Sequence, residues 1–442
     1  MKLDREERHP GYWPSAWPVE CGGNRRQKSA AGRLDADDPP RVTTRSNGLW
    51  NVMFVQREPD EWFLQGTTPI LHRSSAHGWV ERVDSETLEP RATSPELPCG
   101  GHVWCGALLA HADGSIYTVN GSYLHRLDPD CAVLAEKELP ADRAHNGLLA
   151  LSDGTLVTKD LRLEAQGPST LSLLSPGTLE LVGEPFVLPE ASMGRIAADR
   201  DSDGDWIYVP GTEHLFRLHW DGQQLSLDDT WRPRYRDANG DQGLAWDSCL
   251  SGGGVWWMNN GDIESVRAIF GAMPNGNLAP EDAERLSWRR DAPWRGPQQL
   301  FRATVAADSP SRSVVLSGKP GGAIIAPPVF VPEYGLVVGW DSLNRGLFGL
   351  EWEDGKEPRP RWQLDIRPTM QPVVYPDSGE IVINDFVEPR SDELVIVDLE
   401  SGRLKCRAPT GSPIANGMFL SPGRHRDIFY ASTGSIARIA WG

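Results

Sequence analysis

Short apolar runs alternate with glycine-containing turns along most of the chain. The run Gly106–Ala110 leads into the turn Asp113-Gly114, and a second apolar run, Ile116–Val119, follows. An apolar strand, an Asp-Gly turn and another apolar strand together predict a β-hairpin. Comparable hairpins begin near residues 48, 106, 147, 194, 243, 328, 372 and 417.

The spacing of these hairpins predicts a repeat architecture. The intervals between them are 58, 41, 47, 49, 85, 44 and 45 residues, and most hairpins are followed by a third strand such as Tyr123–Leu127. A period of about 40–50 residues with four short strands is typical of a β-propeller blade. We therefore predict an all-β fold, a β-propeller of eight blades over residues 41–442, with seven blades as the next alternative. Residues 1–40 are predicted to form an N-terminal extension.

The start of the repeat array offers a strand that its end lacks. Only three strands remain after Gly417, and the stretch Arg41–Arg45 precedes the first hairpin. Placing that stretch beside the last strands would remove sheet edges that an open ring exposes. We expect the propeller to be closed by N- and C-terminal strands in one blade.

The interval of 85 residues is nearly twice as long as its neighbours. Its surplus, at about residues 261–297, is longer than connections inside a compact domain usually are. Long loops of this kind often act as lids or binding loops. We predict a cap insertion in which Trp288 and Trp294 cover the apolar part of a substrate.

Composition narrows the classes of function. The chain has 442 residues, a formal net charge of −17 and 39% hydrophobic residues. Such an acidic balance argues against nucleic acid or an anionic membrane surface as the main partner. No apolar run is long enough to span a membrane, no secretory leader is recognisable, and the six cysteines contain no CxxC pair, which together favour a cytoplasmic, reduced protein. No phosphate-binding loop is present, so we expect a small-molecule substrate and no nucleotide cofactor.

Polar residues recur where the predicted strands begin and end. The start of an innermost strand and the end of the second strand lie on the same side of a blade, so side chains at both places should line the central channel. Carboxylate and amide oxygens suit a divalent cation, Ca²⁺ or Mg²⁺/Mn²⁺. Asn and Asp also cap turns at strand ends, and this purely structural alternative stays open. The predicted metal ligands are Asn146, Asp160, Asp341, Asn384 and Asp385, and the predicted substrate-binding residues, besides the two tryptophans, are Gln242, Asn259, Gln371 and Asn416.

Two histidines, His102 and His145, lie close to the start of a predicted innermost strand. His145 is a candidate general base, and His102 is a second candidate catalytic residue, because neutral imidazole titrates near working pH. No Gly-x-Ser-x-Gly elbow supports a serine nucleophile.

Two sets of motifs resemble known propeller families. The openings Asn47-Gly-Leu-Trp, Asn146-Gly-Leu-Leu and Asn416-Gly-Met-Phe resemble those of gluconolactonase and strictosidine-synthase-like propellers, which have six blades. In the lactonase branch such an Asn binds a catalytic divalent cation, so the resemblance implies this role for Asn146 or Asn416. The segments Val397–Arg403 and Gly322–Val329 resemble eight-bladed quinoprotein-like propellers, which supports the blade layout.

Three functions follow from these features. The first is a metal-dependent hydrolase, lactonase- or esterase-like, or a lyase that acts on a small cyclic or aromatic substrate in the channel. A cation held by Asn146, Asp341 and Asp385 would polarise the substrate, and His145 would move protons. The alternative is a non-catalytic propeller scaffold that binds a ligand or a protein, because this fold carries many unrelated functions. The third is a metal-free lyase or redox enzyme that uses His102 and His145.

Overall fold

The alternating sequence forms almost exclusively short antiparallel strands. The computed structural model describes residues 8–68, 76–263, 295–305, 311–322, 326–387, 391–412 and 417–442. It consists of two compact units, each made of several chain segments. Among the described residues, unit 1 holds Thr158–Ser172 and Gly183–Pro368, and unit 2 holds residues 8–157, Leu173–Val182 and Thr369–Gly442.

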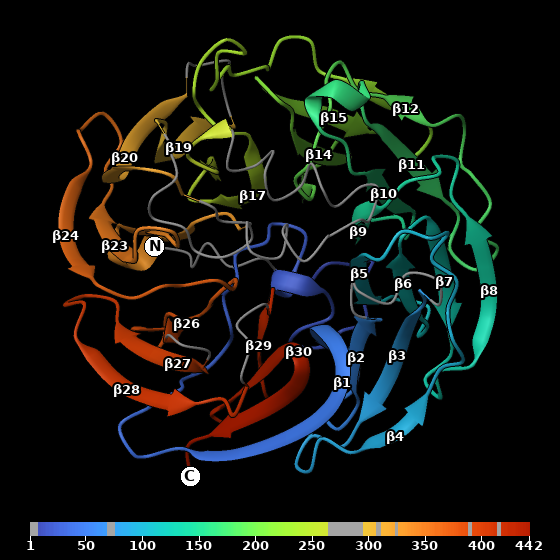
Figure 1. Cartoon of the computed structure of the whole chain (residues 1–442). Helices are drawn as coiled ribbons and strands as arrows, with labels where there is room; N and C mark the ends of the chain where they lie inside the picture. Colours follow the sequence, from blue (N-terminus) through green and yellow to red (C-terminus); the bar gives the residue numbers. More distant parts are fainter. Residues whose placement is uncertain are drawn as a thin grey trace. The chain divides into compact units, whose positions relative to one another are not determined.

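Unit 1 contains three complete four-stranded sheets, each connected in simple up-and-down order (Figure 1). The first consists of β13 (Ala197–Arg200), β14 (Asp205–Pro210), β15 (Leu215–Trp220) and β16 (Leu225–Leu227). The second consists of β17 (Ala245–Ser251), β18 (Gly254–Asn259), β19 (Pro297–Thr304) and β20 (Arg312–Pro320). The third consists of β21 (Val329–Val331), β22 (Leu336–Asp341), β23 (Gly346–Glu351) and β24 (Arg359–Leu364), with the 3₁₀ turn η4 (Pro332–Tyr334) between its first two strands.

Unit 2 contains two four-stranded sheets and one sheet of six strands. The four-stranded sheets are β5 (Cys105–Ala110), β6 (Ile116–Asn120), β7 (Tyr123–Leu127) and β8 (Val133–Glu138), and β25 (Val373–Tyr375), β26 (Glu380–Val387), β27 (Ser391–Asp398) and β28 (Leu404–Pro409). The six strands are, in sheet order, β29 (Leu420–Pro422), β30 (Asp427–Ala440), β1 (Arg41–Gln56), β2 (Trp62–Thr67), β3 (Gly78–Val83) and β4 (Pro90–Thr93). The 3₁₀ turn η1 (Glu20–Gly22) precedes them in the chain.

The structure describes one further four-stranded sheet. It consists of β9 (His145–Ala150), β10 (Leu156–Asp160), β11 (Thr170–Leu174) and β12 (Phe186–Val187), and η3 (Glu164–Gln166) lies between β10 and β11.

Burial falls from the first strand of a sheet to the last. All six residues of β5 are buried, whereas β8 alternates between exposed and partly exposed residues. The first strand has both of its faces covered, and the last strand forms the solvent edge. In unit 2, Leu109 and Tyr117 pack with Leu148 of β9 in one apolar cluster, so the apolar residues of the hairpins join neighbouring sheets.

The described strands form seven sheets, so the prediction of eight blades was wrong and the alternative of seven holds. The difference arises in the six-stranded sheet. Residues 41–46 of β1 pair with residues 435–440 of β30, and residues 50–56 of the same strand pair with β2. Two hairpin units that the sequence spacing counts separately therefore share one hydrogen-bonded sheet, because β1 belongs to both (Figure 1).

The prediction that terminal strands share one blade is confirmed by this pairing. Arg41 lies opposite Ala440 and Ser46 lies opposite Ser435. The ends of β30 also lie together, since the backbone N–H of Trp441 donates to the carbonyl of Arg426 at 3.0 Å. The strand thus folds back near Gly434, whose φ of 81° suits glycine.

Candidate functional site

The expected convergence of strand ends occurs within single blades. In unit 1 the amide Nδ2 of Asn259, at the end of β18, donates to Oε1 of Gln242, which precedes β17, at 2.6 Å. In unit 2 Nδ2 of Asn384 on β26 donates to Oγ1 of Thr369, which precedes β25, at 2.6 Å. Residues that precede an innermost strand therefore contact residues of the second strand, as the strand directions require.

Asp341 and Asp160, both in unit 1, use their carboxylates in local hydrogen bonds. Asp341 accepts from Ser317 Oγ at 2.5 Å and from Asn344 Nδ2 at 2.9 Å, and burial raises the pKa of its carboxyl group. Asp160 accepts from Arg162 Nε at 2.5 Å and from the backbone N–H of Thr170 at 2.6 Å. Both carboxylates thus hold neighbouring segments of the chain together through hydrogen bonds.

The predicted ligands of unit 2 also have protein partners. Asp385 forms an ion pair with Arg407 at 2.9 Å, and the indole N–H of Trp104 donates to Oδ1 of Asn146 at 3.2 Å. Both predicted ligands are almost completely buried. Within the described residues no group of three or more His, Cys, Asp and Glu side chains is arranged to hold a metal ion. Asn146 and Asp385 belong to unit 2 and Asp341 to unit 1, and the divalent cation stays a prediction.

The two candidate catalytic histidines have different surroundings. His145 is buried, with Nδ1 at 3.0 Å from the carbonyl oxygen of Arg143. His102 is partly exposed, with Nε2 at 2.9 Å from Oδ1 of Asp142. Their catalytic roles stay predictions.

Three of the predicted substrate-binding residues, Trp288, Trp294 and Asn416, lie outside the described residues. Most of the predicted cap at about residues 261–297 also lies outside them.

The Asn-Gly openings have a structural explanation. Gly48 and Gly147 have φ values of 68° and 83°, a region that glycine enters without strain. The pairing of β1 is irregular between Ser46 and Trp50, so the first Asn-Gly pair marks the place where β1 changes partner. Oδ1 of Asn47 accepts from the N–H of Leu49 at 3.1 Å and helps to hold this conformation.

A cluster of buried charges that the sequence analysis missed surrounds Asp160 in unit 1. Lys159 is completely buried, and its Nζ donates to the carbonyl oxygens of Asp160 and Ser192, each at 2.9 Å. Burial lowers the pKa of Lys159 to about 7, and the positive charges of Arg195 and Arg162 act in the same direction. A buried amine that titrates near neutral pH is a frequent feature of functional sites.

Arg195 and Asp247 complete this cluster. Both side chains are fully buried, and Nη1 of Arg195 lies 3.7 Å from Oδ2 of Asp247. The backbone N–H of Arg195 donates to Oδ1 of the same carboxylate at 2.7 Å. Met193 and Trp246, neighbours of these two residues in sequence, belong to an adjoining apolar cluster. The only available sequence signal was Lys159 itself, a charged residue within the apolar strand β10.

A second missed network lies in unit 2 around Asp392 of β27. Its carboxylate accepts from the hydroxyl of Tyr430 at 2.7 Å and from Nδ2 of Asn384 at 3.0 Å. Phe386 lies opposite Asp392 in the sheet, so Asn384 and Asp392 share one face while Asp385 lies on the other. Burial raises the pKa of Asp392 to about 7, with a smaller contribution from the negative charge of Asp385.

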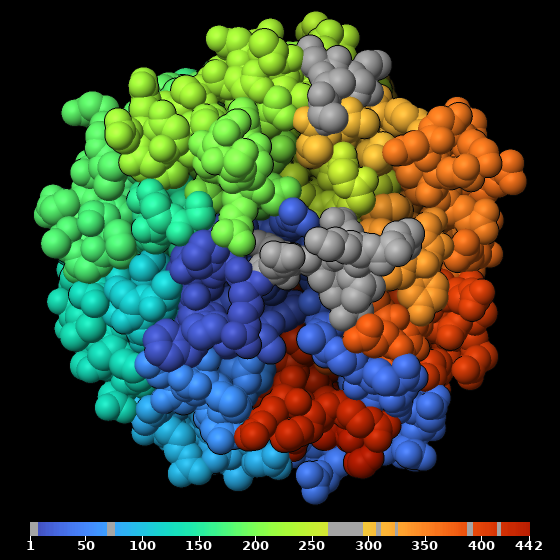
Figure 2. Space-filling model, turned by 180° about the vertical axis from the view of Figure 1, so that it is seen from behind, coloured from blue at the N-terminus to red at the C-terminus, as the bar shows by residue number. Residues whose placement is uncertain are grey.

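Residues 8–38, here called the N-terminal segment, pack along innermost strands of unit 2. Tyr12 pairs with His111, Val19 pairs with Leu109 of β5, and Ser29 pairs with Val374 of β25. These residues form part of the surface of one face of the protein, where Figure 2 shows them in dark blue. The residues predicted as an N-terminal extension are therefore integrated into unit 2.

The core of the N-terminal segment is polar and conformationally restricted. Glu20 and Arg26 form an ion pair in which both side chains are fully buried. Cys21, Arg26 and Lys28 all have positive φ values, between 55° and 62°. Such conformations are costly for residues with a Cβ atom and persist where the surrounding structure enforces them, often at functional sites. Sγ of Cys21 contacts Oε1 of the predicted substrate-binding residue Gln371 at 2.9 Å.

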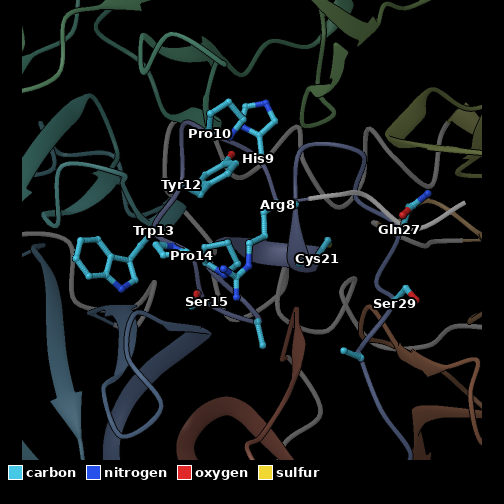
Figure 3. A pocket seen from close by; sticks show the side chains of 15 residues that line it. Arg8, His9, Pro10, Tyr12, Trp13, Pro14, Ser15, Cys21, Gln27 and Ser29 are labelled. Atoms are coloured by element: carbon cyan, nitrogen blue, oxygen red, sulfur yellow. The ribbon is translucent and has the colours of Figure 1, made fainter. Parts of the chain in front are cut away.

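The N-terminal segment lines an open cavity of about 300 Å³ in unit 2. Figure 3 shows Arg8 in the middle of this cavity, with Trp13 at one end and Gln27 and Ser29 at the other. The described lining residues include arginine, histidine, two aromatic residues and three prolines, but neither Asp nor Glu. They are Arg8, His9, Pro10, Tyr12, Trp13, Pro14, Ser15, Ala16, Pro18, Cys21, Gly22, Gly23, Gln27, Ser29 and Ala31.

The walls of this cavity are held by Gln56, the last residue of β1, and by Arg57 and Glu58, which follow it in the chain. The guanidinium of Arg57 lies 4.3 Å from the ring centre of Trp13, whose indole N–H donates to Glu58 at 3.1 Å. Ser15 Oγ donates to the carbonyl of Gln56 at 2.6 Å. These bonds fix the aromatic wall before any ligand enters.

Comparisons with known proteins establish the fold. No protein-family model matches the chain, and no curated protein matches it in sequence. Among solved structures, the Dos1 propeller is 10% identical with a TM-score of 0.59, covering 93% of this chain and 97% of that one. A europium-containing methanol dehydrogenase is 12% identical with a TM-score of 0.56, covering 99% of both chains. The WD40 domain of SCAP from fission yeast is 7% identical with a TM-score of 0.51, covering 91% and 98%. These likenesses show that the chain has a β-propeller fold.

The described part of the chain contains no helix with the length and apolar character needed to cross a membrane.

Proposed function

We propose that this protein binds a small organic anion with an apolar ring in the cavity of the N-terminal segment. The observation that carries the proposal is the cavity itself, because concave sites of about 300 Å³ and more with a few polar groups are the usual sites of small-molecule binding. This proposal corresponds to the ligand-binding alternative of the sequence analysis.

The charges of the described lining residues favour an anionic ligand. The chain has a net charge of −17, yet the described residues around the cavity include Arg8 and no carboxylate. A guanidinium forms paired hydrogen bonds with a planar carboxylate, whereas a cationic ligand would meet no opposite charge among the described lining residues. Tyr12, Trp13 and the prolines offer apolar surface to a ring.

The cavity is also suited to binding because its walls are ordered without a ligand. Trp13 is held on one side by Arg57 and at its N–H by Glu58. Side chains that are already fixed lose little conformational entropy when a ligand binds. Affinity for a small ring compound should therefore depend on Trp13 as well as on Arg8.

Isothermal titration calorimetry with three single-ring probes tests the proposal. We expect benzoate to bind, benzyl alcohol to bind at least tenfold more weakly, and benzylamine to give no heat. Arg8→Gln should abolish the preference for benzoate. Arg33→Gln is the matched control, because Arg33 belongs to the same segment, lines no part of the cavity and pairs with Asp35 at the surface. Equal binding of the three probes, or equal loss in both variants, would contradict the proposal.

A hydrolase or lyase that acts on a small cyclic or aromatic substrate is the second candidate. The observation that favours it is Lys159, a buried amine whose pKa is near 7 and which is therefore capable of proton transfer at neutral pH. Turnover of an aromatic lactone by the wild type, lost in Lys159→Met, would support it. If a metal chelator abolished this turnover in the wild type, the metal-dependent form of the hydrolase would be supported.

A further inference from the structure

The cavity of the N-terminal segment has two ends that differ in chemistry. Figure 3 shows Trp13 at one end, Gln27 and Ser29 at the other, and Arg8 between them. The cavity volume of about 300 Å³ corresponds to about ten water molecules at liquid density. Benzoate is smaller than this volume, so a ring and a carboxylate leave room for a further group toward the polar end.

Ser29 brings a hydroxyl group to the polar end of the cavity. It is one of the lining residues, and among the described residues its buried Oγ has no hydrogen-bond partner. A buried hydroxyl group that makes no hydrogen bond raises the free energy of the unliganded protein, and a ligand group that bonds to it relieves this cost. Ser15, which also lines the cavity, provides the contrast, since its Oγ already donates to the carbonyl oxygen of Gln56 at 2.6 Å.

The two ends of the cavity are held at a fixed separation by strands of unit 2. The backbone N–H of Trp13 donates to the carbonyl oxygen of Ala110, the last residue of β5, at 3.0 Å. Ser29 pairs with Val374 of β25, where the N–H of Ala30 donates to the carbonyl oxygen of Val374 at 2.8 Å. The fold therefore sets the positions of the aromatic end and the polar end before a ligand binds, which lowers the entropic cost of binding.

We propose that the ligand of this cavity is an N-acylated aromatic amino acid, either free or at the carboxyl end of a peptide. This inference rests on the proposed binding of a ring-bearing anion in the same cavity. The ring packs on Trp13, the carboxylate pairs with the guanidinium of Arg8, and the amide forms a hydrogen bond with the hydroxyl of Ser29. An amide suits this end because it both donates and accepts, as do the serine hydroxyl and the carboxamide of Gln27.

Three separate contacts make the cavity selective for one enantiomer of such a ligand. The ring, the carboxylate and the acylamino group diverge from one stereocentre, the ring through a methylene group. The mirror-image compound can bring two of these groups to Trp13, Arg8 and Ser29, but the remaining group then points away from its partner. Enantiomers have the same volume, charge and hydrophobicity, so a preference between them reports the arrangement of the lining groups.

Titration calorimetry with hydrocinnamate and N-acetylphenylalanine tests the inference, because the two carboxylates differ only in the acetylamino group. We expect one enantiomer of N-acetylphenylalanine to bind about tenfold more tightly than hydrocinnamate and than its own mirror image. Ser29→Ala should remove most of both differences and leave the affinity for hydrocinnamate unchanged. Ser15→Ala is the matched control and should leave both ratios unchanged, because the hydroxyl of Ser15 already has a partner.

A short peptide that ends in phenylalanine of the preferred handedness distinguishes the two sources of the ligand. Tighter binding of the peptide than of N-acetylphenylalanine would assign the cavity to a peptide end, and the reverse order would assign it to the free compound. Equal binding of hydrocinnamate and both enantiomers, or a preference that Ser29→Ala leaves intact, would overturn the inference, while the preference for benzoate that depends on Arg8 would be unaffected. Loss of the benzoate preference itself would overturn the anion site and this inference together.

Discussion

Replacing Asp392 by asparagine should remove a specific pH dependence from the stability of unit 2. The carboxyl group of Asp392 is buried between the hydroxyl of Tyr430 and the amide of Asn384, and its pKa is raised from 3.8 to about 7. Both hydrogen bonds favour the ionised form, but the cost of burying its charge is larger. Asparagine has nearly the same shape and carries no charge at any pH.

The magnitude follows from the linkage between protonation and folding. Between pH 4 and 7 the folded protein keeps this proton while the unfolded chain has lost it, so stability falls as the pH rises through this window. A displacement of about three pH units corresponds to about 4 kcal/mol at about 1.4 kcal/mol per unit. Asp392→Asn should therefore match the wild type near pH 4 and exceed its free energy of unfolding by up to about 4 kcal/mol at pH 8.

Urea unfolding followed by tryptophan fluorescence at several pH values between 4 and 8 measures this difference. Asp365→Asn, at a carboxylate whose side chain is 85% exposed, is the control and should follow the wild type at every pH. The reasoning is refuted if Asp392→Asn and the wild type show the same dependence on pH, or if the variant is the less stable protein at pH 8.

Three further variants test other parts of the structure. Between pH 7 and 10.5 the folded protein has lost a proton from Lys159 that the unfolded chain keeps, so the stability of the wild type should rise by up to about 5 kcal/mol across this range. Lys159→Met should remove this rise, which urea unfolding at several pH values measures. Gly194→Ala should cost at least about 3 kcal/mol in thermal unfolding, because its Cβ would stand 1.8 Å from the carbonyl oxygen of Trp246. Arg26→Met should cost about 3–5 kcal/mol in urea unfolding, because it leaves Glu20 charged and buried without its cation.

Each of these variants has a matched control. Lys356→Met alters an exposed lysine and should leave the slope between pH 7 and 10.5 unchanged. Gly240→Ala places its Cβ no closer than 3.3 Å to any neighbour and should cost less than about 1 kcal/mol. Arg33→Met removes an ion pair at the surface, which solvent screens, and should leave the midpoint of urea unfolding nearly unchanged. Equal effects in a variant and its control would contradict the corresponding argument.

The repeat itself was predictable because hairpins are local. An apolar run, an Asp-Gly turn and another apolar run predict two paired strands from residues that are close in sequence, and β5 and β6 form in this way. The terminal strand at Arg41–Ser46 was also predictable, since the last blade visibly lacked an outer strand. The blade count was wrong because β1 extends through two hairpin units, and no local pattern shows how far a strand continues.

The site was only partly predictable. Strand direction alone brings Gln242 to Asn259, so the position of these two residues in the blade follows from the repeat. Whether a polar strand end caps a turn, pairs with an arginine or meets a ligand depends on side chains from other blades. Asp341 of β22 illustrates this, because Ser317, which donates to its carboxylate at 2.5 Å, belongs to β20 of the preceding sheet.

The sequence by itself determined the strands, their turns and the blade order, because alternation of apolar residues and turn-forming residues acts over a few positions. Only the tertiary structure decided the charge environment of Lys159 and Asp392 and the cavity of the N-terminal segment. Burial shifts a pKa through all the groups that replace water around it, and those groups come from distant segments such as Asp247 and Tyr430. A polar N-terminal stretch likewise becomes part of a core only when strands such as β5 and β25 are assembled beside it.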